Sequence, residues 1–283
     1  MSEPLSPPAL MELSSLSGIP VDDAAMAERI EIISAERVQT EFVKLMLGKH
    51  PRRGLEALVD SGLAERVLPE LPALKLEVDE HHHHKDVFEH TLTVVDQAID
   101  YEKDYGLEGD FVLRFAALMH DIGKPATRKL EPGGGVSFYH HDIVGAKLAK
   151  KRMQALRFDN DTIKAVCLLI ELHLRFFGYS DSAWTDSAIR RYVRDAGEQL
   201  PRLHALTRAD VTTRNKRKAD RLSHAYDDLE QRIAVIAEQE QLDAIRPDLS
   251  GEDIMRILDL KPSRDVGQAY DFLLELRLEE GPL

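Results

Sequence analysis

The apolar positions of the chain recur mainly at helical spacing, and alternating apolar and polar runs are nearly absent. From Ala24 to Met46 they recur every three to five positions, which predicts a helix ended by the segment at 49–51. Residues 52–71 predict two short helical segments with a turn at Ser61-Gly62.

The rest of the chain continues the helical pattern after a charged break at residues 77–86, where the apolar periodicity stops. The glycine-rich stretch at 130–141 is expected to be a loop, and the residues from Pro201 to Leu242 form either one long helix or a broken pair. We therefore predict an all-α fold. The other expected helices cover residues 87–102, 110–123, 143–157, 162–177, 186–197, 246–260 and 263–280.

Composition narrows the class of protein. The 283 residues are 43% hydrophobic, enough for one large or two small compact units. The single cysteine excludes a disulfide framework and suits a reducing cytoplasm, where we expect the protein to be located. No apolar run reaches 18 residues, so no membrane span or membrane partner is expected, and the Ser/Pro-rich first 23 residues resemble a disordered lead-in rather than a signal peptide.

The net charge of −13 argues against a protein that grips nucleic acid over its whole surface. One basic cluster departs from this balance. Two interpretations of it stay open: the solvated face of a long helix, or a contact to phosphate or RNA. The cluster comprises Arg214, Lys216, Arg217, Lys218 and Arg221.

Three places carry candidate chemistry. The pair His120-Asp121 ends a very apolar helix, where a carboxylate is costly to bury unless a cation compensates it. His90 lies in another apolar helix, and Asp210 follows Leu203 and Leu206 in a third. Imidazole and carboxylate ligands together suit Mn, Fe, Ni, Zn or Mg, so we expect a divalent metal that polarises water and phosphoryl oxygens.

The dipeptide alone is a weak signal, because a second pair occurs at His141-Asp142 and a lone buried histidine is more often a core residue than a ligand. The ordered set is more specific. HKDVFEHTLTVV, FAALMHDIGKP and LTRAD together resemble the H…HD…D signature of the HD superfamily of metal-dependent phosphohydrolases.

A second resemblance covers most of residues 24–283. ERIEIISAERVQTEFVKLML and GLEALVDSGLAERVLPEL are similar to the neck of bacterial tRNA nucleotidyltransferases (CCA-adding enzymes), within the poly(A) polymerase family. After the lead-in at 1–23, these resemblances imply a helical, RNA-binding-like neck at 24–78, an HD phosphohydrolase domain at 79–215 and a helical tail at 216–283.

The HD resemblance implies a metal shell of His90, His120, Asp121 and Asp210. His141 and His173 stand where members with two metals have extra histidines, and they are either ligands or polar groups that orient substrate or fill an edge. In a dinuclear site Asp121 would bridge the ions and have a catalytic role.

Beside this shell, Lys124 is the expected phosphate contact and is also counted as catalytic, with a plain surface lysine as the alternative. Arg128 and Lys129 are weaker candidates for phosphate or RNA. His81, His82, His83 and His84 are expected to be solvated, with His84 the best placed of them to support a ligand.

The resembled enzymes add nucleotides with an N-terminal head that carries a Gly-Gly-Ser-type turn and an Asp-x-Asp pair. We find neither pattern upstream of Ala24, so we expect that this chain alone does not add CCA.

Three functions compete. The first is hydrolysis of phosphomonoesters or 2′,3′-cyclic phosphates of nucleotides or RNA 3′ ends. The second is a tRNA-binding neck and body that acts in tRNA 3′ processing without its own head. The third is a nucleotide triphosphohydrolase, which assays with dNTPs would separate from the first.

Overall fold

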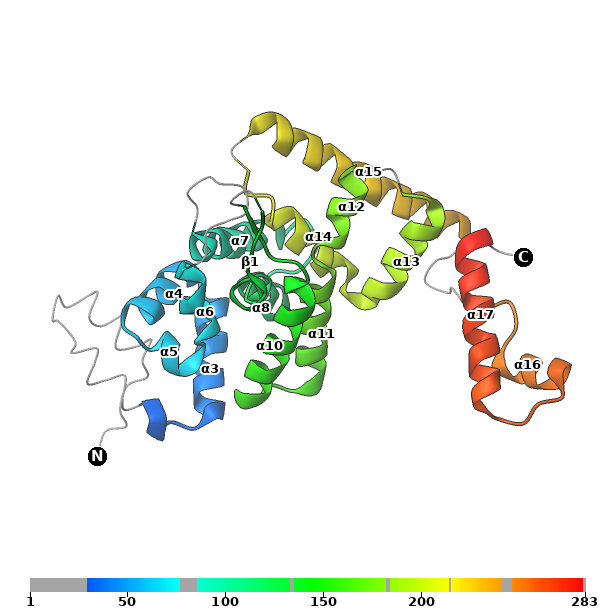
Figure 1. The fold of residues 1–283 in the computed structure, drawn as a ribbon, viewed down its shortest axis with the longest axis horizontal. Coiled ribbons are helices and arrows are strands. Elements are labelled where there is room, and N and C mark those ends of the chain that lie inside the picture. Colours follow the sequence, from blue (N-terminus) through cyan, green and yellow to red (C-terminus); the bar gives the residue numbers. More distant parts are fainter. Residues whose placement is uncertain are drawn as a thin grey trace. The chain divides into compact units, whose positions relative to one another are not determined.

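The structure is a computed structural model that describes residues 30–76, 86–132, 135–181, 184–213, 215–240 and 246–281. Within these ranges the chain is almost wholly helical, which confirms the all-α prediction (Figure 1). One antiparallel hairpin is the exception: β1 (Lys129–Leu130) pairs with β2 (Val136–Ser137), so the segment predicted as a loop contains two short strands. The expected lead-in at 1–23 and the residues around the boundary at 78 lie outside the described residues.

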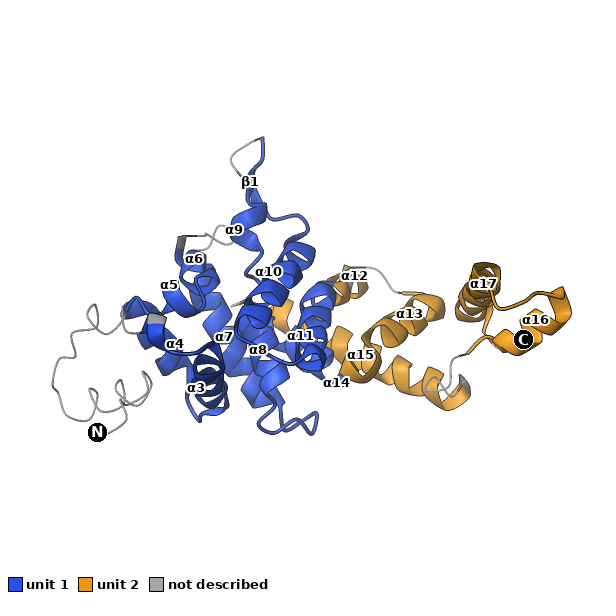
Figure 2. Ribbon diagram, turned by 90° about the horizontal axis from the view of Figure 1, so that it is seen from below, with its two compact units in different colours: residues 1–174, 201–212 blue, residues 175–200, 213–283 orange. Residues whose placement is uncertain are grey.

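The chain divides into two compact units (Figure 2). Unit 1 holds the residues up to 174 together with 201–212, and unit 2 holds 175–200 together with 213–283. This division is not sequential, because residues 201–212 return to the first unit. The predicted domain boundaries at 78 and 215 divide the chain at other positions than these two units do, and they remain a prediction.

Unit 1 is organised around α8 (Phe111–Met119), which packs against α3, α7 and α11. Its residues 113–119 are all buried, and all of them except Arg114 are apolar, as expected of a helix at the centre of a bundle. All the remaining helices of this unit except α9 contribute buried residues to its core. The remaining helices are α3 (Ala35–Leu47), α4 (Pro51–Asp60), α5 (Ala64–Val67), α6 (Glu70–Ala73), α7 (Val87–Tyr101), α9 (Lys124–Thr127), α10 (His141–Ala155), α11 (Asn160–Leu172) and α14 (Leu200–Ala209, whose first residue is assigned to unit 2), with the 3₁₀ turns Ile30–Ile32 and Leu74–Leu76.

Helix α3 begins later than its apolar pattern predicts. Residues 30–32 form a 3₁₀ turn, and Ser34 adopts an extended backbone whose hydroxyl accepts a hydrogen bond from the Arg37 amide. A serine in this position satisfies one of the free amides of the first helical turn, so the helix begins at Ala35.

Unit 2 contains the other helices. Its longest is α15, and the pattern from 201 to 242 is resolved as a broken pair, since α14 ends at Ala209 and α15 begins at Lys216. No described helix is both long and apolar enough to cross a bilayer. The elements of unit 2 are α12 (Arg175–Asp181), α13 (Asp186–Ala196), the 3₁₀ turn Gly197–Gln199, α15 (Lys216–Glu240), α16 (Gly251–Leu258) and α17 (Arg264–Glu280).

Candidate metal centre

His90 lies in the second turn of α7. The helix begins after Asp86, whose carboxylate accepts a hydrogen bond from the Phe88 amide. The His90 side chain is 12% exposed, and its Nδ1 lies 3.0 Å from the Thr212 hydroxyl. This contact fixes the ring with Nε2 facing His120, 3.3 Å away.

His120 and Asp121 follow the end of α8 and are almost completely buried. The last carbonyls of a helix have no intrahelical donor, and Nδ1 of His120 lies 2.8 Å from one of them, that of Ala117. The ring is therefore held at the helix end, and its Nε2 lies 3.3 Å from Oδ2 of Asp121.

His141 and His173 are held in the same way. Nδ1 of His141 lies 2.8 Å from the Phe138 carbonyl at the start of α10, and Nδ1 of His173 lies 2.6 Å from the Ile170 carbonyl at the end of α11. Both rings are buried. In three of the four histidines a carbonyl three residues earlier sets the ring orientation.

Asp210 lies just beyond the end of α14 rather than inside a helix. Its Oδ1 lies 3.0 Å from Nε2 of His90 and 3.5 Å from Nε2 of His120. Thr212, which contacts His90, follows in the same short segment. Helices α7, α8 and α14 thus bring the predicted set of four side chains together.

The structure gathers six candidate ligands into two groups, each with its ligand atoms within 4.8 Å of one another. Asp121 belongs to one group and contacts the other, with Oδ1 3.3 Å from Nε2 of His141 and Oδ2 3.5 Å from Nε2 of His90. A carboxylate in this position has the geometry to bridge two ions. One group is His90, His120 and Asp210, and the other is Asp121, His141 and His173.

The hydrogen bonds to Nδ1 determine what the cluster can bind. A carbonyl only accepts, so Nδ1 of His120, His141 and His173 must donate, and a neutral ring then has its lone pair on Nε2. Nε2 of His173 is buried and makes no hydrogen bond to any described residue. Inward lone pairs beside two carboxylates fit a divalent cation with nitrogen and oxygen ligands, and the cluster could hold one or two such ions.

The charges of the protein groups by themselves favour a positive charge inside the cluster. Burial disfavours the charged form of His120, but Asp121 and Asp210 outweigh it and raise its pKa to about 10. Burial also opposes ionisation of the two aspartates, yet the adjacent His120 holds both pKa values well below the usual range. Burial and His120 lower the pKa of His173 to about 4. Without an ion, a proton on His120 therefore balances part of the negative charge.

The residues predicted to contact phosphate differ in their surroundings. The Lys124 ammonium lies 2.8 Å from Oδ2 of Asp121, whereas Arg128 and Lys129 are exposed at the start of the hairpin. Lys216, Arg217 and Lys218 are exposed in the first turn of α15, which belongs to unit 2. Arg214 and His81, His82, His83 and His84 lie outside the described residues.

Two contributors were not predicted from the sequence. Thr212 orients His90, and its place two residues after Asp210 is the only signal that could have indicated it. Gly123 lets α10 approach the turn after α8, since a Cβ there would lie 2.1 Å from the His141 carbonyl oxygen. This packing role of Gly123 depends on contacts that are made only in the fold.

Comparisons with known proteins support both the neck and the HD resemblance of the sequence. Residues 24–74 match the family described as "Probable RNA and SrmB- binding site of polymerase A", and residues 87–215 match the HD domain. The A-adding tRNA nucleotidyltransferase of Deinococcus radiodurans is 32% identical over 252 residues, covering 89% of this chain and 56% of that protein. The CC-adding tRNA nucleotidyltransferase of Thermus thermophilus is 33% identical over 250 residues, covering 86% and 53%.

A Multifunctional CCA protein of Neisseria meningitidis is 32% identical over a shorter match of 149 residues, which covers 52% of this chain and 33% of that protein. The chain spans about half the length of the two tRNA nucleotidyltransferases. It carries an HD domain and a polymerase-A-type RNA-binding region, and over the neck and HD region it is homologous to CCA-adding tRNA nucleotidyltransferases.

Proposed function

We propose that this chain is a metal-dependent phosphohydrolase that acts on phosphomonoesters or 2′,3′-cyclic phosphates of nucleotides or RNA 3′ ends. The observation that carries the proposal is the convergence of four histidine Nε2 atoms and two carboxylates, at most 10% exposed, in one cluster within unit 1. Buried groups of this kind are costly for a purely structural helical bundle unless a cation compensates them.

His90, His120, Asp121 and Asp210 would hold one divalent ion, and His141 and His173 would hold a second ion with Asp121 between them. A bound ion of this kind activates water and neutralises charge on a phosphoryl group. The Lys124 ammonium, 2.8 Å from Asp121, brings a positive charge to the place where phosphoryl oxygens would bind.

The proposed reaction on a cyclic phosphate consumes one water. A bond forms between the water oxygen and phosphorus, and one bond from phosphorus to a ribose oxygen breaks. The departing ribose oxygen takes up a proton, which leaves a phosphomonoester. The buried side of the cluster would limit solvent access, and the fixed rings would need little reorganisation.

Hydrolysis of 2′,3′-cyclic AMP and p-nitrophenyl phosphate with Ni²⁺, Mn²⁺ or Mg²⁺ tests the proposal. We expect the His120→Ala-Asp121→Ala variant to lose at least about 100-fold in kcat/KM. A matched control is His224→Ala-Asp142→Ala, in which His224 is exposed and neither residue belongs to the six. Equal turnover by the wild type and the site variant would reject the proposal.

A second candidate is a tRNA-binding body that acts in tRNA 3′ processing. A separate observation favours it: three adjacent cations, Lys216, Arg217 and Lys218, are exposed at the start of α15 in a chain of net charge −13. Basic residues oppose the dipole at a helix N-terminus, so helix stability does not account for them. The relatives' names concern tRNA, and the match at 24–74 concerns RNA.

For this candidate we expect salt-sensitive tRNA binding. Neutralising Lys216, Arg217 and Lys218 should lower the slope of log affinity against log salt by about 2 to 3. The control variant neutralises three exposed lysines of α10, which removes the same charge: Lys147, Lys150 and Lys151. If both variants lost tRNA binding equally, the loss would come from the change in net charge, and a local tRNA contact at the start of α15 would be rejected.

A further inference from the structure

Tyr139 is an aromatic residue that the fold exposes beside the candidate metal centre. It is 71% exposed, and Leu130 on the adjoining hairpin is 67% exposed. Within the described part of the chain, the Tyr139 ring has no aromatic partner and its hydroxyl makes no hydrogen bond. The described residues around Tyr139 therefore leave most of its ring uncovered, and only a bound molecule could bury it further.

A tight turn fixes the position of Tyr139. Phe138, just before Tyr139, and His141, two residues after it, are buried, and the Phe138 carbonyl accepts hydrogen bonds from the amide (3.2 Å) and Nδ1 (2.8 Å) of His141. His140 completes the turn in the left-handed region, with φ 63°. An aromatic residue on such an anchored turn loses little conformational entropy when a ligand binds.

The same turn places Tyr139 close to the six-residue cluster. Tyr139 precedes His141 by two residues, so their Cα atoms are separated by at most about 7 Å. His141 Nε2 lies 3.3 Å from Asp121, and the Lys124 ammonium lies 5.7 Å from the centroid of the Phe138 ring. If the phosphate of a nucleotide lay in this cluster, the distance from the phosphate to the base would be similar to the distance from the cluster to Tyr139.

We propose that Tyr139 is a stacking platform for the nucleobase of the substrate, so that the site selects nucleotides or RNA ends over other phosphate esters. This inference rests on the proposed phosphohydrolase function and names the part of the substrate that the metal centre does not contact. Stacking on an exposed ring tolerates any base, so the platform predicts preference for nucleotides without preference among bases.

Two cyclic phosphates separate the platform from the catalytic centre. The substrate 2′,3′-cyclic AMP carries a base, and glycerol 1,2-cyclic phosphate has the same five-membered ring without one. We expect Tyr139→Ala to lower kcat/KM for 2′,3′-cyclic AMP by about 5- to 100-fold, mainly through KM. The loss should be several times smaller for the glycerol ester. Tyr139→Phe should retain the preference, because the ring and not the hydroxyl stacks.

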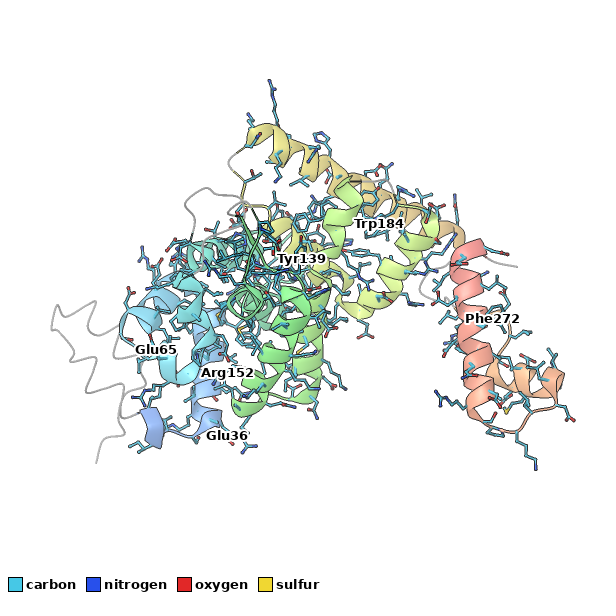
Figure 3. The ribbon with its side chains drawn as sticks, viewed as in Figure 1. Glu36, Glu65, Tyr139, Arg152, Trp184 and Phe272 are labelled. Carbon is cyan, nitrogen blue, oxygen red and sulfur yellow. The ribbon has the colours of Figure 1, made fainter. Side chains whose placement is uncertain are left out.

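Phe272→Ala is the matched control, because Phe272 is an exposed aromatic residue like Tyr139 (67% against 71%) but lies in α17 of unit 2 (Figure 3). We expect it to leave both rates at the wild-type level. Thermal melting of each variant shows whether it is folded. Equal losses on the two substrates in folded Tyr139→Ala would overturn the proposal.

A second readout does not depend on turnover. Saturation-transfer NMR of AMP with Mg²⁺, with intact AMP followed in the same spectra, reports contact between the protein and the base protons. The signal should be present in the wild type and in Tyr139→Phe, and lost in Tyr139→Ala. If the wild type hydrolyses neither ester, the proposed function fails. A base-proton signal that persists in Tyr139→Ala, or is absent from the wild type, overturns the platform.

Discussion

Gly123 and His141 are in contact through their backbones, closely enough that position 123 has no room for a side chain. A Cβ on Gly123 would lie 2.1 Å from the His141 carbonyl oxygen and 2.7 Å from the Gly145 amide nitrogen. Gly123 follows Asp121 by two residues, and His141 begins α10. This contact therefore sets the distance between two members of the candidate metal centre.

Gly123→Ala should force α10 away from the turn after α8. We expect a loss of about 1–3 kcal/mol in the free energy of unfolding, because backbone atoms and not flexible side chains would have to move. Metal affinity should fall as well, since Asp121 and His141 would separate. Urea denaturation and metal titration measure the two effects.

Gly267→Ala is the control for that substitution. Gly267 is exposed inside α17, and a Cβ there meets nothing within 4 Å. The control should gain about 0.5–1 kcal/mol. Similar behaviour of the two variants would show that the close approach at Gly123 does not constrain the fold.

Metal binding should depend on pH through His120. With the pKa of its metal-free imidazole raised to about 10, an ion must displace a proton, so apparent affinity should rise between pH 7 and 9 by up to about tenfold per unit. Calorimetry in buffers of different ionisation enthalpy should show about one proton released per first ion. An affinity that does not change over this range would contradict the coupling.

The same pKa shift makes metal-free stability depend on pH. His120 is raised above its ordinary value of 6.5, so its contribution is complete below about pH 6.5 and is lost as pH rises through about 10. The apo protein should therefore lose stability over this window, as measured by urea denaturation. His224→Ala should show the same profile as the wild type, whereas His120→Ala should not.

The buried ion pair of Arg114 and Glu102 should be important for stability. Nη2 of Arg114 lies 2.8 Å from Glu102, and its Nη1 donates to the Met46 carbonyl at 2.8 Å. Arg114→Met should cost about 3–5 kcal/mol, because it leaves a buried carboxylate without its partner. Lys164→Met breaks an exposed pair with Asp161 and should change the free energy of unfolding by less than about 0.5 kcal/mol.

A double variant separates the charge from the packing. In Arg114→Met-Glu102→Leu the uncompensated carboxylate is gone, so part of the lost stability should return. If the double variant is as unstable as the single one, the carboxylate is not the source of the cost.

Cys167 should react slowly with thiol reagents. Burial and the nearby Glu171 raise its pKa to about 11, so very little thiolate exists at pH 8. Reaction with a disulfide reagent at pH 8 should be about 100-fold slower than for free cysteine and should accelerate with pH. The urea-unfolded chain should react at the ordinary rate. Fast reaction of the folded protein would show that the thiol is not shielded.

Much of the architecture could be predicted because helical periodicity is a local property. The apolar helices around His90 and His120 were expected near their observed positions, and the break after Ala209 was one of two stated alternatives. Within the described residues, the helix expected from Ala24 begins at Ala35. Its start is set by one hydrogen bond to the Ser34 side chain, which the spacing of apolar residues does not reveal. The pairing of Leu130 with Val136 joins two strands six positions apart in the chain, and helical periodicity does not predict such a contact.

The amino-acid sequence was enough to identify the main chemical groups: a His-Asp pair after an apolar helix, a histidine in a second helix, a later aspartate and a single cysteine. The positions of His141 and His173 beside the first four residues, and the inward direction of the Nε2 atoms, became evident from the fold alone. Ring orientation depends on carbonyls freed at helix ends and on the close packing allowed at Gly123. Both arise from how helices meet, which the spacing of residues along one helix does not encode.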